Sequence, residues 1–524
     1  MIRKIYILGL IIIISAGCKK NDAYFIKPNI VAVDLVIPAD SIKLNPYGYA
    51  PLSALVNFSS TVNGKTVVIV KGKNGAASDI EHVFNDEGAY HSIPVIGLYG
   101  DFLNTVDIML INNSGDTIAK SSINIQTGPL PANMPAITAD VNETGKAEKG
   151  INLVSNFSAG VPLVRTPGSP QIPLMVDNYG DIRWLLDFTT HPDLNTLFYD
   201  NGIKQLRNGN FYFGDWWSNK IYEVDLLGKI IDTWDFSATE FVFHHEVKEK
   251  PDGNFLITVT KKNSASIEDY IIEIDRQTHN IKTVWDLKES LDRNRTALVD
   301  GFYTYSDWMH LNSILYDSTD NTIIASGRAQ GVVKLSFDNK VKWILSPHRG
   351  WGRNGRGEDL NQFLLTPLDA AGNKITDTAV LDGYVDHPDF EWNWYQHSAI
   401  ALPNGNYMFF DNGSVRNYDE AAARYSRAVE YKIDPVNMTV QQKWQYGKER
   451  GLETFSLIVS SVQYLPNTNH VLFSSGFRVQ NKDGLGGKIV EIDYATKKIV
   501  SQLSFSAANE WGFHKVERIS AYPQ

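Results

Sequence analysis

The fold is decided by the segment WYQHSAIALPNGNYMFFDNG, residues 394–413. It predicts two short strands, 398–402 and 406–410, which fold back on each other through the tight turn Pro403-Asn404-Gly405. His397 stands where the first strand begins. The segment therefore predicts a β-hairpin with a histidine at its head.

The same layout returns at two other places in the chain. His245 lies six positions before the proline of its turn, as His397 does, and His310 heads a third hairpin whose turn is slightly longer. A single histidine at a strand start usually has only a structural role. If the repeats surround an axis, however, equivalent positions face one another across it. The repeat therefore predicts that three imidazoles converge on one pocket.

A module of four strands joined by tight turns recurs through the second part of the chain. The copies begin near Ile203, His245, His310, His397 and Ser460. Residues 173–188 supply only the second half of a module and residues 513–522 only an opening strand, so the two segments complete each other. Four strands over about 35–50 residues are typical of a β-propeller blade. We therefore predict a six-bladed β-propeller over residues 150–524, closed between its two ends.

Short alternating strands separated by turn residues also fill residues 31–140, for example SALVNFS at 53–59 and KTVVIVKG at 65–72. Several such strands without a helical pattern predict a small N-terminal β-sandwich. Three prolines between residues 129 and 135 mark the linker to the propeller. The 24 Tyr, 24 Phe and 12 Trp residues agree with an all-β fold class, because aromatic side chains favour strands.

The N-terminus has the pattern of an export signal. A basic start, an apolar run over residues 5–14 and three small residues precede Cys18, the only cysteine in the chain. The apolar run is too short to span a membrane, and the cysteine after it resembles a bacterial lipobox. We predict a lipoprotein signal peptide over residues 1–17, acylation of Cys18 and a lipid-anchored tether over residues 18–30. The alternative is an ordinary cleaved signal with an incidental cysteine.

The charge of the chain limits its partners. Removal of residues 1–17 takes away two basic residues and no acidic one, so the formal charge moves from −10 to −12. An acidic protein is a poor candidate for nucleic-acid binding. The predicted location is the cell envelope, as a lipoprotein of the outer membrane that faces the periplasm or the cell surface. Its membrane contact would be the N-terminal lipid anchor, and assembly as a homodimer is left open.

The predicted pocket contains His245, His310, His397 and, at the end of the strand after His310, Arg328. Three histidines could bind a metal, but metal-binding histidines generally have carboxylates behind them, and a guanidinium would repel a cation. Arg328 favours an anion instead, because its planar fork of donors suits sulfate, phosphate or carboxylate oxygens. The alternative is that Arg328 stacks on an aromatic ring or pairs with an acid. Strand alternation should turn His244 away from the face of His245.

Two connections into the inner strands are unusually long, over residues 287–309 and 346–396. Long connections in a compact domain are often lids or binding loops, and aromatic ones suit a flat apolar ligand. The predicted substrate-binding residues are Tyr305, Trp308, Trp351 and Trp394, together with His244.

Several longer motifs stand in a fixed order along the chain: NPYGYAPLSALV at 45–56, HSIPVIGLYGDFLNTV at 91–106, FHHEV at 243–247, DWMHLNSI at 307–314, SGRAQ at 326–330, QHSAIALPNGN at 396–406 and FDNG at 410–413. Together they resemble motifs of the bacterial arylsulfate sulfotransferases that do not use a nucleotide sulfate donor. The resemblance implies that His397 takes up the sulfuryl group while His245, His310 and Arg328 hold its oxygens. The chain departs from better-known relatives in lacking a cysteine pair and in its lipobox.

The chemistry of the residues agrees with this resemblance. A neutral imidazole nitrogen can attack sulfur and expel a phenolate, whose pKa of about 10 makes it a far better leaving group than an alkoxide. We therefore expect an aryl sulfate donor, a phenol acceptor and ping-pong kinetics, with no cofactor and no metal. One alternative is a non-catalytic, lipid-anchored propeller that binds an aromatic anion or a glycan. A second is a hydrolase that passes the group to water.

Overall fold

The computed structural model describes residues 31–143, 145–158, 168, 170–199, 202–298, 306–507 and 511–523. The predicted signal peptide, Cys18 and the tether lie outside these residues, as does Tyr305. Among the described residues, no helix is long and apolar enough to cross a membrane. The described part of the chain has two short α-helices, α1 (Leu287–Ser290) and α2 (Thr378–Leu381), and strands form nearly all of its other regular structure.

The N-terminal domain is the predicted sandwich. Its strands are β1 (Val33–Asp34), β2 (Ile42–Leu44), β3 (Ser53–Val70), β4 (Ile80–Val83), β5 (Gly88–Ile96), β6 (Leu103–Ile111) and β7 (Thr117–Gln126). The predicted strand 53–59 and most of the predicted strand 65–72 belong to the single strand β3, which ends at Val70. The first half of β3 pairs with β2 and β5, and its second half pairs with β4 and β6. Side chains from both halves, such as Val56 and Val68, are fully buried in one core.

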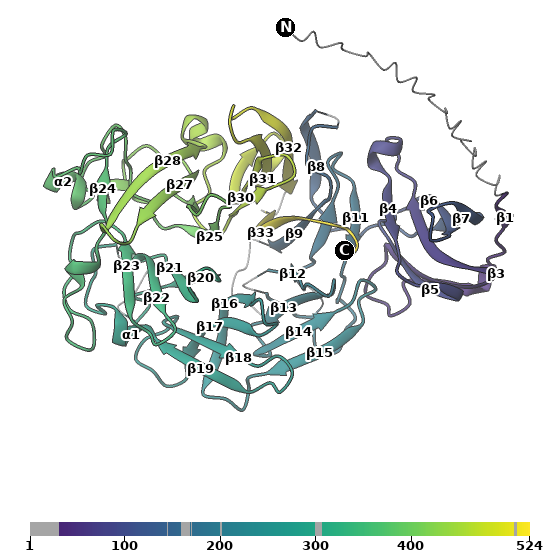
Figure 1. Cartoon of the computed structure of the whole chain (residues 1–524), viewed down its shortest axis with the longest axis horizontal. Helices are drawn as coiled ribbons and strands as arrows, with labels where there is room; N and C mark the ends of the chain where they lie inside the picture. The colour runs from purple at the N-terminus through teal and green to yellow at the C-terminus, as the bar shows by residue number, and fades with distance from the viewer. Residues whose placement is uncertain are drawn as a thin grey trace, which may run out of the picture.

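The propeller has six blades arranged as a ring (Figure 1). Blade 1 comprises β12 (Lys204–Gln205), β13 (Phe211–Asp215), β14 (Lys220–Val224) and β15 (Ile230–Asp235); blade 2 comprises β16 (Phe241–Glu249), β17 (Phe255–Lys261), β18 (Tyr270–Ile274) and β19 (Ile281–Asp286). Blade 3 comprises β20 (Leu311–Asp317), β21 (Thr322–Gly327), β22 (Gly331–Ser336) and β23 (Val341–Leu345). Each blade is antiparallel, and its first strand faces the centre of the ring.

Blades 4 and 5 each carry one additional outer strand. Blade 4 comprises β25 (His397–Ala401), β26 (Tyr407–Asp411), β27 (Arg427–Asp434) and β28 (Thr439–Tyr446), with β24 (Thr366–Leu368) beside β28. Blade 5 comprises β29 (Ser461–Leu465), β30 (His470–Asn481), β31 (Gly484–Asp493) and β32 (Ile499–Ala507), with β8 (Ala136–Asn142) beside β32. The extra strands cover outer edges that would otherwise be open to pairing.

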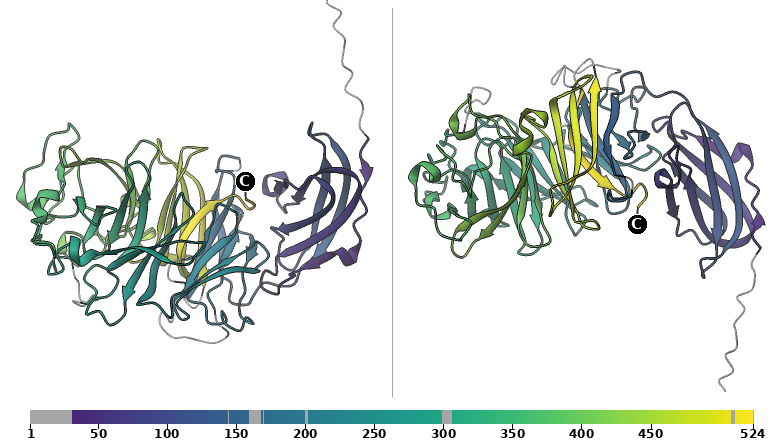
Figure 2. Two further views of the ribbon diagram at one scale, coloured as in Figure 1. Left: turned by 60° about the horizontal axis from the view of Figure 1, so that its bottom comes forward. Right: turned by 90° about the horizontal axis from the view of Figure 1, so that it is seen from above.

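Blade 6 is built from both ends of the propeller, which confirms the predicted closure. It comprises β33 (Trp511–Ile519), β9 (Ile151–Ser158), β10 (Leu174–Val176) and β11 (Ile182–Leu185). The C-terminal β33 pairs antiparallel with β9, with Ile519 opposite Ile151. Just beyond β33, the ring of Tyr522 stacks on His82 of the N-terminal domain, and its hydroxyl accepts a hydrogen bond of 2.9 Å from the backbone of Ile96. The end of the chain therefore links the ring closure to the N-terminal domain (Figure 2).

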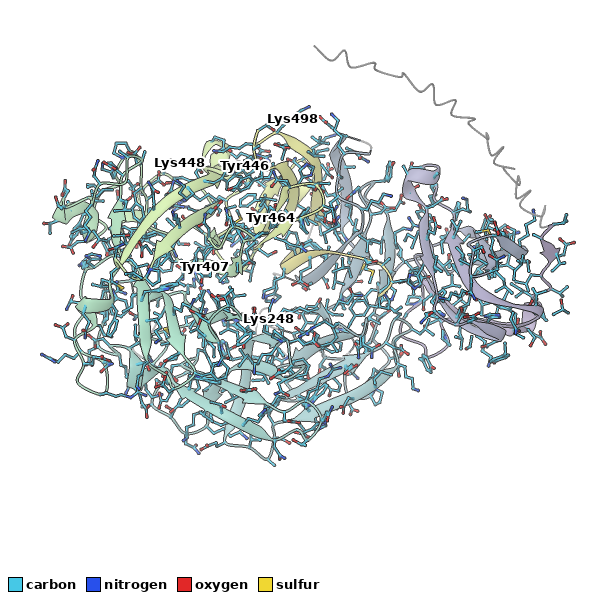
Figure 3. The ribbon with its side chains drawn as sticks, viewed as in Figure 1. Lys248, Tyr407, Tyr446, Lys448, Tyr464 and Lys498 are labelled. Carbon is cyan, nitrogen blue, oxygen red and sulfur yellow. The ribbon has the colours of Figure 1, made fainter. Side chains whose placement is uncertain are left out.

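Buried charges occupy part of the centre of the ring. The carboxylate of Glu246 on β16 pairs with both Lys204 on β12 and Lys515 on β33. Lys248, two residues after Glu246, lies at the centre of the ring in Figure 3. Burial lowers the pKa of Lys515 to about 8. Lys204, Glu246 and Lys515 come from three inner strands, so their ion pairs join the neighbouring blades 6, 1 and 2.

Candidate active site

Irregular backbone lies at or beside each of the three predicted histidines. In blade 2 the pairing of β16 with β17 slips between Phe243 and Val247, and His245 within this bulge has φ of 38°. His310, directly before β20, has φ of 48°. Ser398, in the bulge after His397, has φ of 54°. Left-handed backbone is unfavourable for residues other than glycine and often occurs at functional sites, where bulges also redirect side chains.

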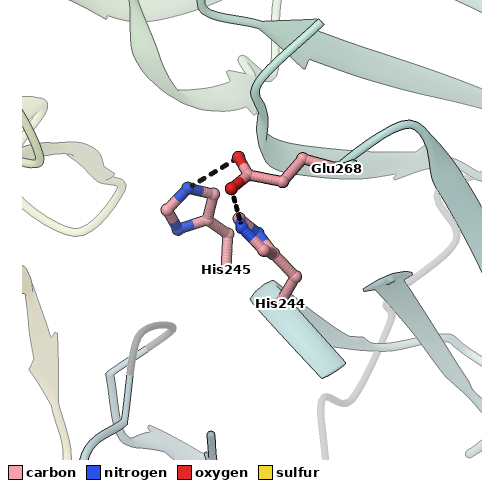
Figure 4. Close-up of side chains that lie close together, drawn as sticks. All are labelled: His244, His245 and Glu268. Atoms are coloured by element: carbon pink, nitrogen blue, oxygen red, sulfur yellow. Dashed lines mark ion pairs between the residues drawn. The ribbon is translucent and has the colours of Figure 1, made fainter. Parts of the chain in front are cut away.

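One carboxylate lies among three imidazoles. Glu268, which is only 8% exposed in the connection between β17 and β18, forms an ion pair through Oε1 with Nε2 of His244. Its Oε2 lies 2.8 Å from Nδ1 of His310 and 3.5 Å from Nε2 of His245. Figure 4 shows this carboxylate between the rings of His244 and His245. The Nε2 atoms of His245 and His310 are 3.3 Å apart.

The position of His244 corrects a prediction from strand alternation. Alternation would turn His244 and His245 to opposite faces of β16. The bulge interrupts alternation at these residues, and both rings contact the carboxylate of Glu268, with their centroids 3.9 Å apart. His244 is therefore part of the same cluster.

His310 lies against two carboxylates. Its Nδ1 is 2.8 Å from Oδ2 of Asp307 as well as 2.8 Å from Oε2 of Glu268. Burial disfavours the charged ring, but the negative charge of Glu268 and the hydrogen bonds to Asp307 and Glu268 outweigh burial and raise the pKa of His310. In turn the charges of His244 and His310 outweigh the burial of Glu268 and hold its pKa well below the usual range. This half of the cluster favours a protonated histidine.

His397 has a different partner. Its Nδ1 lies 2.7 Å from Oδ1 of Asn412, whose Nδ2 donates to the carbonyls of Ser456 at 2.8 Å and Val459 at 3.1 Å. Because both amide donors of Asn412 point at carbonyls, its oxygen must accept the proton of Nδ1. The neutral ring therefore keeps its lone pair on Nε2. His397 is 9% exposed, and its pKa is held well below the usual range by burial and by the nearby positive charge of Arg328, against the opposing effect of Asn412.

Arg328 follows β21 directly, and its backbone N–H donates to the carbonyl of His310 at 3.0 Å. Its guanidinium lies 5.7 Å from the centre of the Tyr395 ring and 3.5 Å from the carbonyl of Leu457. The charges of Arg328, His245 and His310 all act on His397. The structure thus brings together the four residues that the sequence placed in one pocket: His245, His310, Arg328 and His397.

The predicted aromatic substrate-binding residues lie elsewhere. Trp394 has no exposed surface and packs in a core with Tyr418. Trp308 and Trp351 are buried in another core, where their ring N–H groups donate to Asp269 at 2.9 Å and to the carbonyl of Pro347 at 3.1 Å. These three rings pack in cores beneath the long connections, and their predicted contact with substrate stays a prediction.

Three polar residues of the cluster were not predicted from the sequence. Asp307 and Asn412 stand inside the motifs DWMHLNSI and FDNG, so their proximity to His310 and to the start of β25 was available as a signal. Glu268 had no such signal, because it is distant in sequence from His310 and follows an irregular connection. Two carboxylates, those of Glu268 and Asp307, therefore accompany the histidines.

Some atoms of the cluster lie as close together as the ligands of a metal ion. One ligand atom each from His244, His245 and Glu268, or from Glu268, Asp307 and His310, lie within 4.8 Å of one another. The same atoms, however, are engaged in imidazole–carboxylate pairs, and the positive charge of Arg328 is close by. Cationic donors beside a neutral imidazole suit an anion that carries an electrophilic centre. We therefore assign no metal ligands here.

The chain is similar to proteins of one described family over almost its whole length. A family described as "Arylsulfotransferase (ASST)" matches residues 138–514, and a family described as "Arylsulfotransferase Ig-like domain" matches residues 41–128. The arylsulfate sulfotransferase AssT of Escherichia coli O6:H1 (strain CFT073) is 31% identical over 548 aligned residues, covering 88% of this chain and 89% of the relative. The AssT of Lelliottia amnigena is 30% identical over the same shares.

Likeness to solved structures is weaker. A protein of unknown function from Bacteroides caccae has a TM-score of 0.41 at 10% identity and covers 70% of this chain and 98% of that chain. A streptogramin B lyase has a TM-score of 0.32 at 10% identity and covers 87% of this chain and 98% of that chain.

Proposed function

Because the chain belongs to the arylsulfotransferase family, we propose that it transfers a sulfuryl group from an aryl sulfate to a phenol through a covalent intermediate on His397. The observation that carries this proposal is the contact of 2.7 Å between His397 Nδ1 and Asn412 Oδ1. It leaves Nε2 of a neutral ring with a lone pair, which is the form of histidine that can act as a nucleophile.

Transfer takes place in two balanced steps. In the first, Nε2 of His397 forms a bond to sulfur while the bond from sulfur to the aryl oxygen breaks, and the phenolate leaves with the electron pair. In the second, the oxygen of the acceptor phenol bonds to sulfur, the N–S bond breaks, and His397 recovers its lone pair. The proton lost by the acceptor balances the proton gained by the departing phenolate.

Arg328, His245 and His310 stabilise the charge on the sulfuryl oxygens. Sulfuryl transfer resembles phosphoryl transfer, in which positioning and charge stabilisation supply most of the catalysis. The support for these roles is proximity: Arg328, His245 and His310 all lie close enough to His397 to lower its pKa, and His397 is where the sulfur would bind. Arg328 offers a two-pronged donor, and His310, against two carboxylates, offers a cationic one.

The experiment is an assay with 4-nitrophenyl sulfate in the presence and absence of phenol. Release of 4-nitrophenol should rise with phenol, and phenyl sulfate should form in equal amount. Treatment with EDTA should leave the rate unchanged. Equal release with and without phenol, accompanied by free sulfate, would identify a hydrolase, whereas binding of the aryl sulfate without release would identify a non-catalytic binding protein.

The location of the enzyme is part of the proposal. The lipobox before Cys18 supports attachment to the cell envelope, in the outer membrane, with the tether of residues 18–30 between the lipid and the first domain. Cys18→Ala should move the protein from the membrane fraction to the soluble fraction of the envelope. Retention of the variant in the membrane fraction would contradict lipid anchoring.

A further inference from the structure

We propose that Glu268 is a positioning residue for this transfer: its carboxylate holds the rings of His244, His245 and His310 and keeps His310 an imidazolium, which can donate to the sulfuryl oxygens but cannot attack sulfur. The inference rests on the proposed function and extends it, because it explains why His397 acts as the nucleophile and His310 does not.

The first support is the geometry of the carboxylate. Its two oxygens are shared among three rings, with Oε1 paired to His244 and Oε2 lying 2.8 Å from His310 Nδ1 and 3.5 Å from His245 Nε2. A buried carboxylate is costly unless it is paired. Protonated imidazole is the only partner of opposite charge among these rings, so at least one ring must carry charge.

The second support identifies the charged ring. Nδ1 of His310 faces Asp307 as well as Glu268, each at 2.8 Å, and its ring centroid lies 4.9 Å from that of His245 and 6.4 Å from that of His244. A neutral ring could not donate to two carboxylates as effectively as an imidazolium. His310 Nε2–H then points at His245 Nε2, 3.3 Å away, and can turn to an incoming sulfuryl oxygen.

The third support is that Glu268 also fixes the backbone. Its carbonyl accepts a hydrogen bond of 3.2 Å from the N–H of Leu311, the residue after His310, and its own N–H donates to Oγ1 of Thr260 at 2.9 Å. Its φ of 58° lies in the left-handed region. Glu268 of blade 2 therefore controls both the ring of His310 and the start of the inner strand of blade 3.

The consequence for the reaction is a division of roles. An imidazolium has no lone pair on either nitrogen, so His310 cannot form the covalent intermediate. His397, whose partner is the neutral amide of Asn412, keeps its lone pair. Transfer then requires His397 neutral and His310 charged, which predicts a bell-shaped dependence of kcat/KM on pH.

The test compares Glu268→Gln with Glu268→Asp. In ping-pong transfer, kcat/KM for 4-nitrophenyl sulfate reports only the free enzyme and the donor, and this donor does not titrate between pH 5 and 10. Glu268→Gln removes the charge but keeps the shape, so the alkaline limb should move to lower pH, with a loss on the order of 10²-fold above that limb. Glu268→Asp keeps the charge, so its alkaline limb should stay near that of the natural enzyme.

The control is Glu273→Gln, which removes another buried carboxylate of blade 2, paired with Lys250 at 2.7 Å. It should change thermal stability without moving either limb. If Glu268→Gln and Glu268→Asp both lower the rate and leave the limbs in place, Glu268 has a merely structural role and the proposal is overturned.

A second readout does not depend on turnover. The imidazole carbon and nitrogen shifts of His310, followed by NMR against pH in the intact protein, should show a midpoint above the ordinary histidine value of about 6.5, and the midpoint should move to lower pH in Glu268→Gln. If the natural enzyme transfers no sulfuryl group, the proposed function is wrong, but the NMR titration still reports whether Glu268 raises the pKa of His310. A natural enzyme that transfers sulfuryl groups but has His310 neutral at pH 6.5 would overturn the role given to Glu268.

Discussion

The two sides of the histidine cluster differ in what lies behind each ring. On blades 2 and 3 the carboxylates of Glu268 and Asp307 face His310, whereas on blade 4 the amide of Asn412 faces His397. A carboxylate stabilises an imidazolium, and an amide oxygen fixes the tautomer of a neutral ring. Residues of the same type in equivalent places of a repeat can therefore serve as a charged donor in one blade and as a nucleophile in another.

The largest expected effect comes from removal of the amide-backed ring. His397→Ala should lower transfer by at least about 10⁴-fold, because no neighbouring group can carry the sulfuryl group in its place. His279→Ala, at a half-exposed surface histidine near Asp232, serves as the control and should keep full activity. If His397→Ala keeps a tenth of the rate, the nucleophile is one of the histidines that contact a carboxylate. The roles assigned to the two sides of the cluster would then be wrong.

A smaller effect is expected at the arginine between the two sides. Arg328→Lys should lower kcat/KM on the order of 10²–10³-fold, because lysine is a point charge without the planar fork that matches two oxygens. As a control, Arg353→Lys changes an arginine whose side chain donates to the carbonyl of Gly357 at 2.7 Å, and this variant should keep full activity. Full activity of Arg328→Lys would show that only positive charge is required there.

The smallest effect is expected when the amide behind His397 is replaced by a carboxylate. Asn412→Asp places a carboxylate behind His397 and should raise its pKa, which in the natural protein is held well below the usual range. The neutral ring is then lost as pH falls through the raised pKa, so the acid limb of kcat/KM should move to higher pH. We expect about a tenfold loss at pH 6 that largely disappears at pH 9. An unchanged acid limb would mean that the partner of His397 does not set its charge.

Much of this architecture can be predicted from the repeat pattern of the sequence. The charges of the histidine rings cannot, because their partners are placed by irregular backbone. Equivalent positions of His245, His310 and His397 follow from the module, because a blade repeats its inner strand at a fixed place. The partners of these rings do not follow, since the bulge of β16 breaks the alternation that would separate His244 from His245. Glu268 reaches them from a connection that has no periodicity.

The tryptophans also show what the sequence alone could not predict. A long connection rich in tryptophan predicts a binding loop, but it predicts a packed core equally well, because large apolar side chains gain most from burial. Trp308, Trp351 and Trp394 are buried in cores of the propeller. Sequence composition cannot distinguish an indole that covers the site from one that supports the loop beneath it.

The central claim is that His397, and no carboxylate-backed histidine, carries the sulfuryl group. The most direct measurement is rapid mixing with 4-nitrophenyl sulfate without acceptor, an alkaline quench that preserves the N–S bond, and mass spectrometry of tryptic peptides. We predict an increase of about 80 Da on the peptide of residues 375–416, with fragment ions that place it on His397 rather than His387, and its loss when phenol is added. An adduct on the peptide that contains His244 and His245 or on that of His310, or no adduct during steady turnover, would contradict the account.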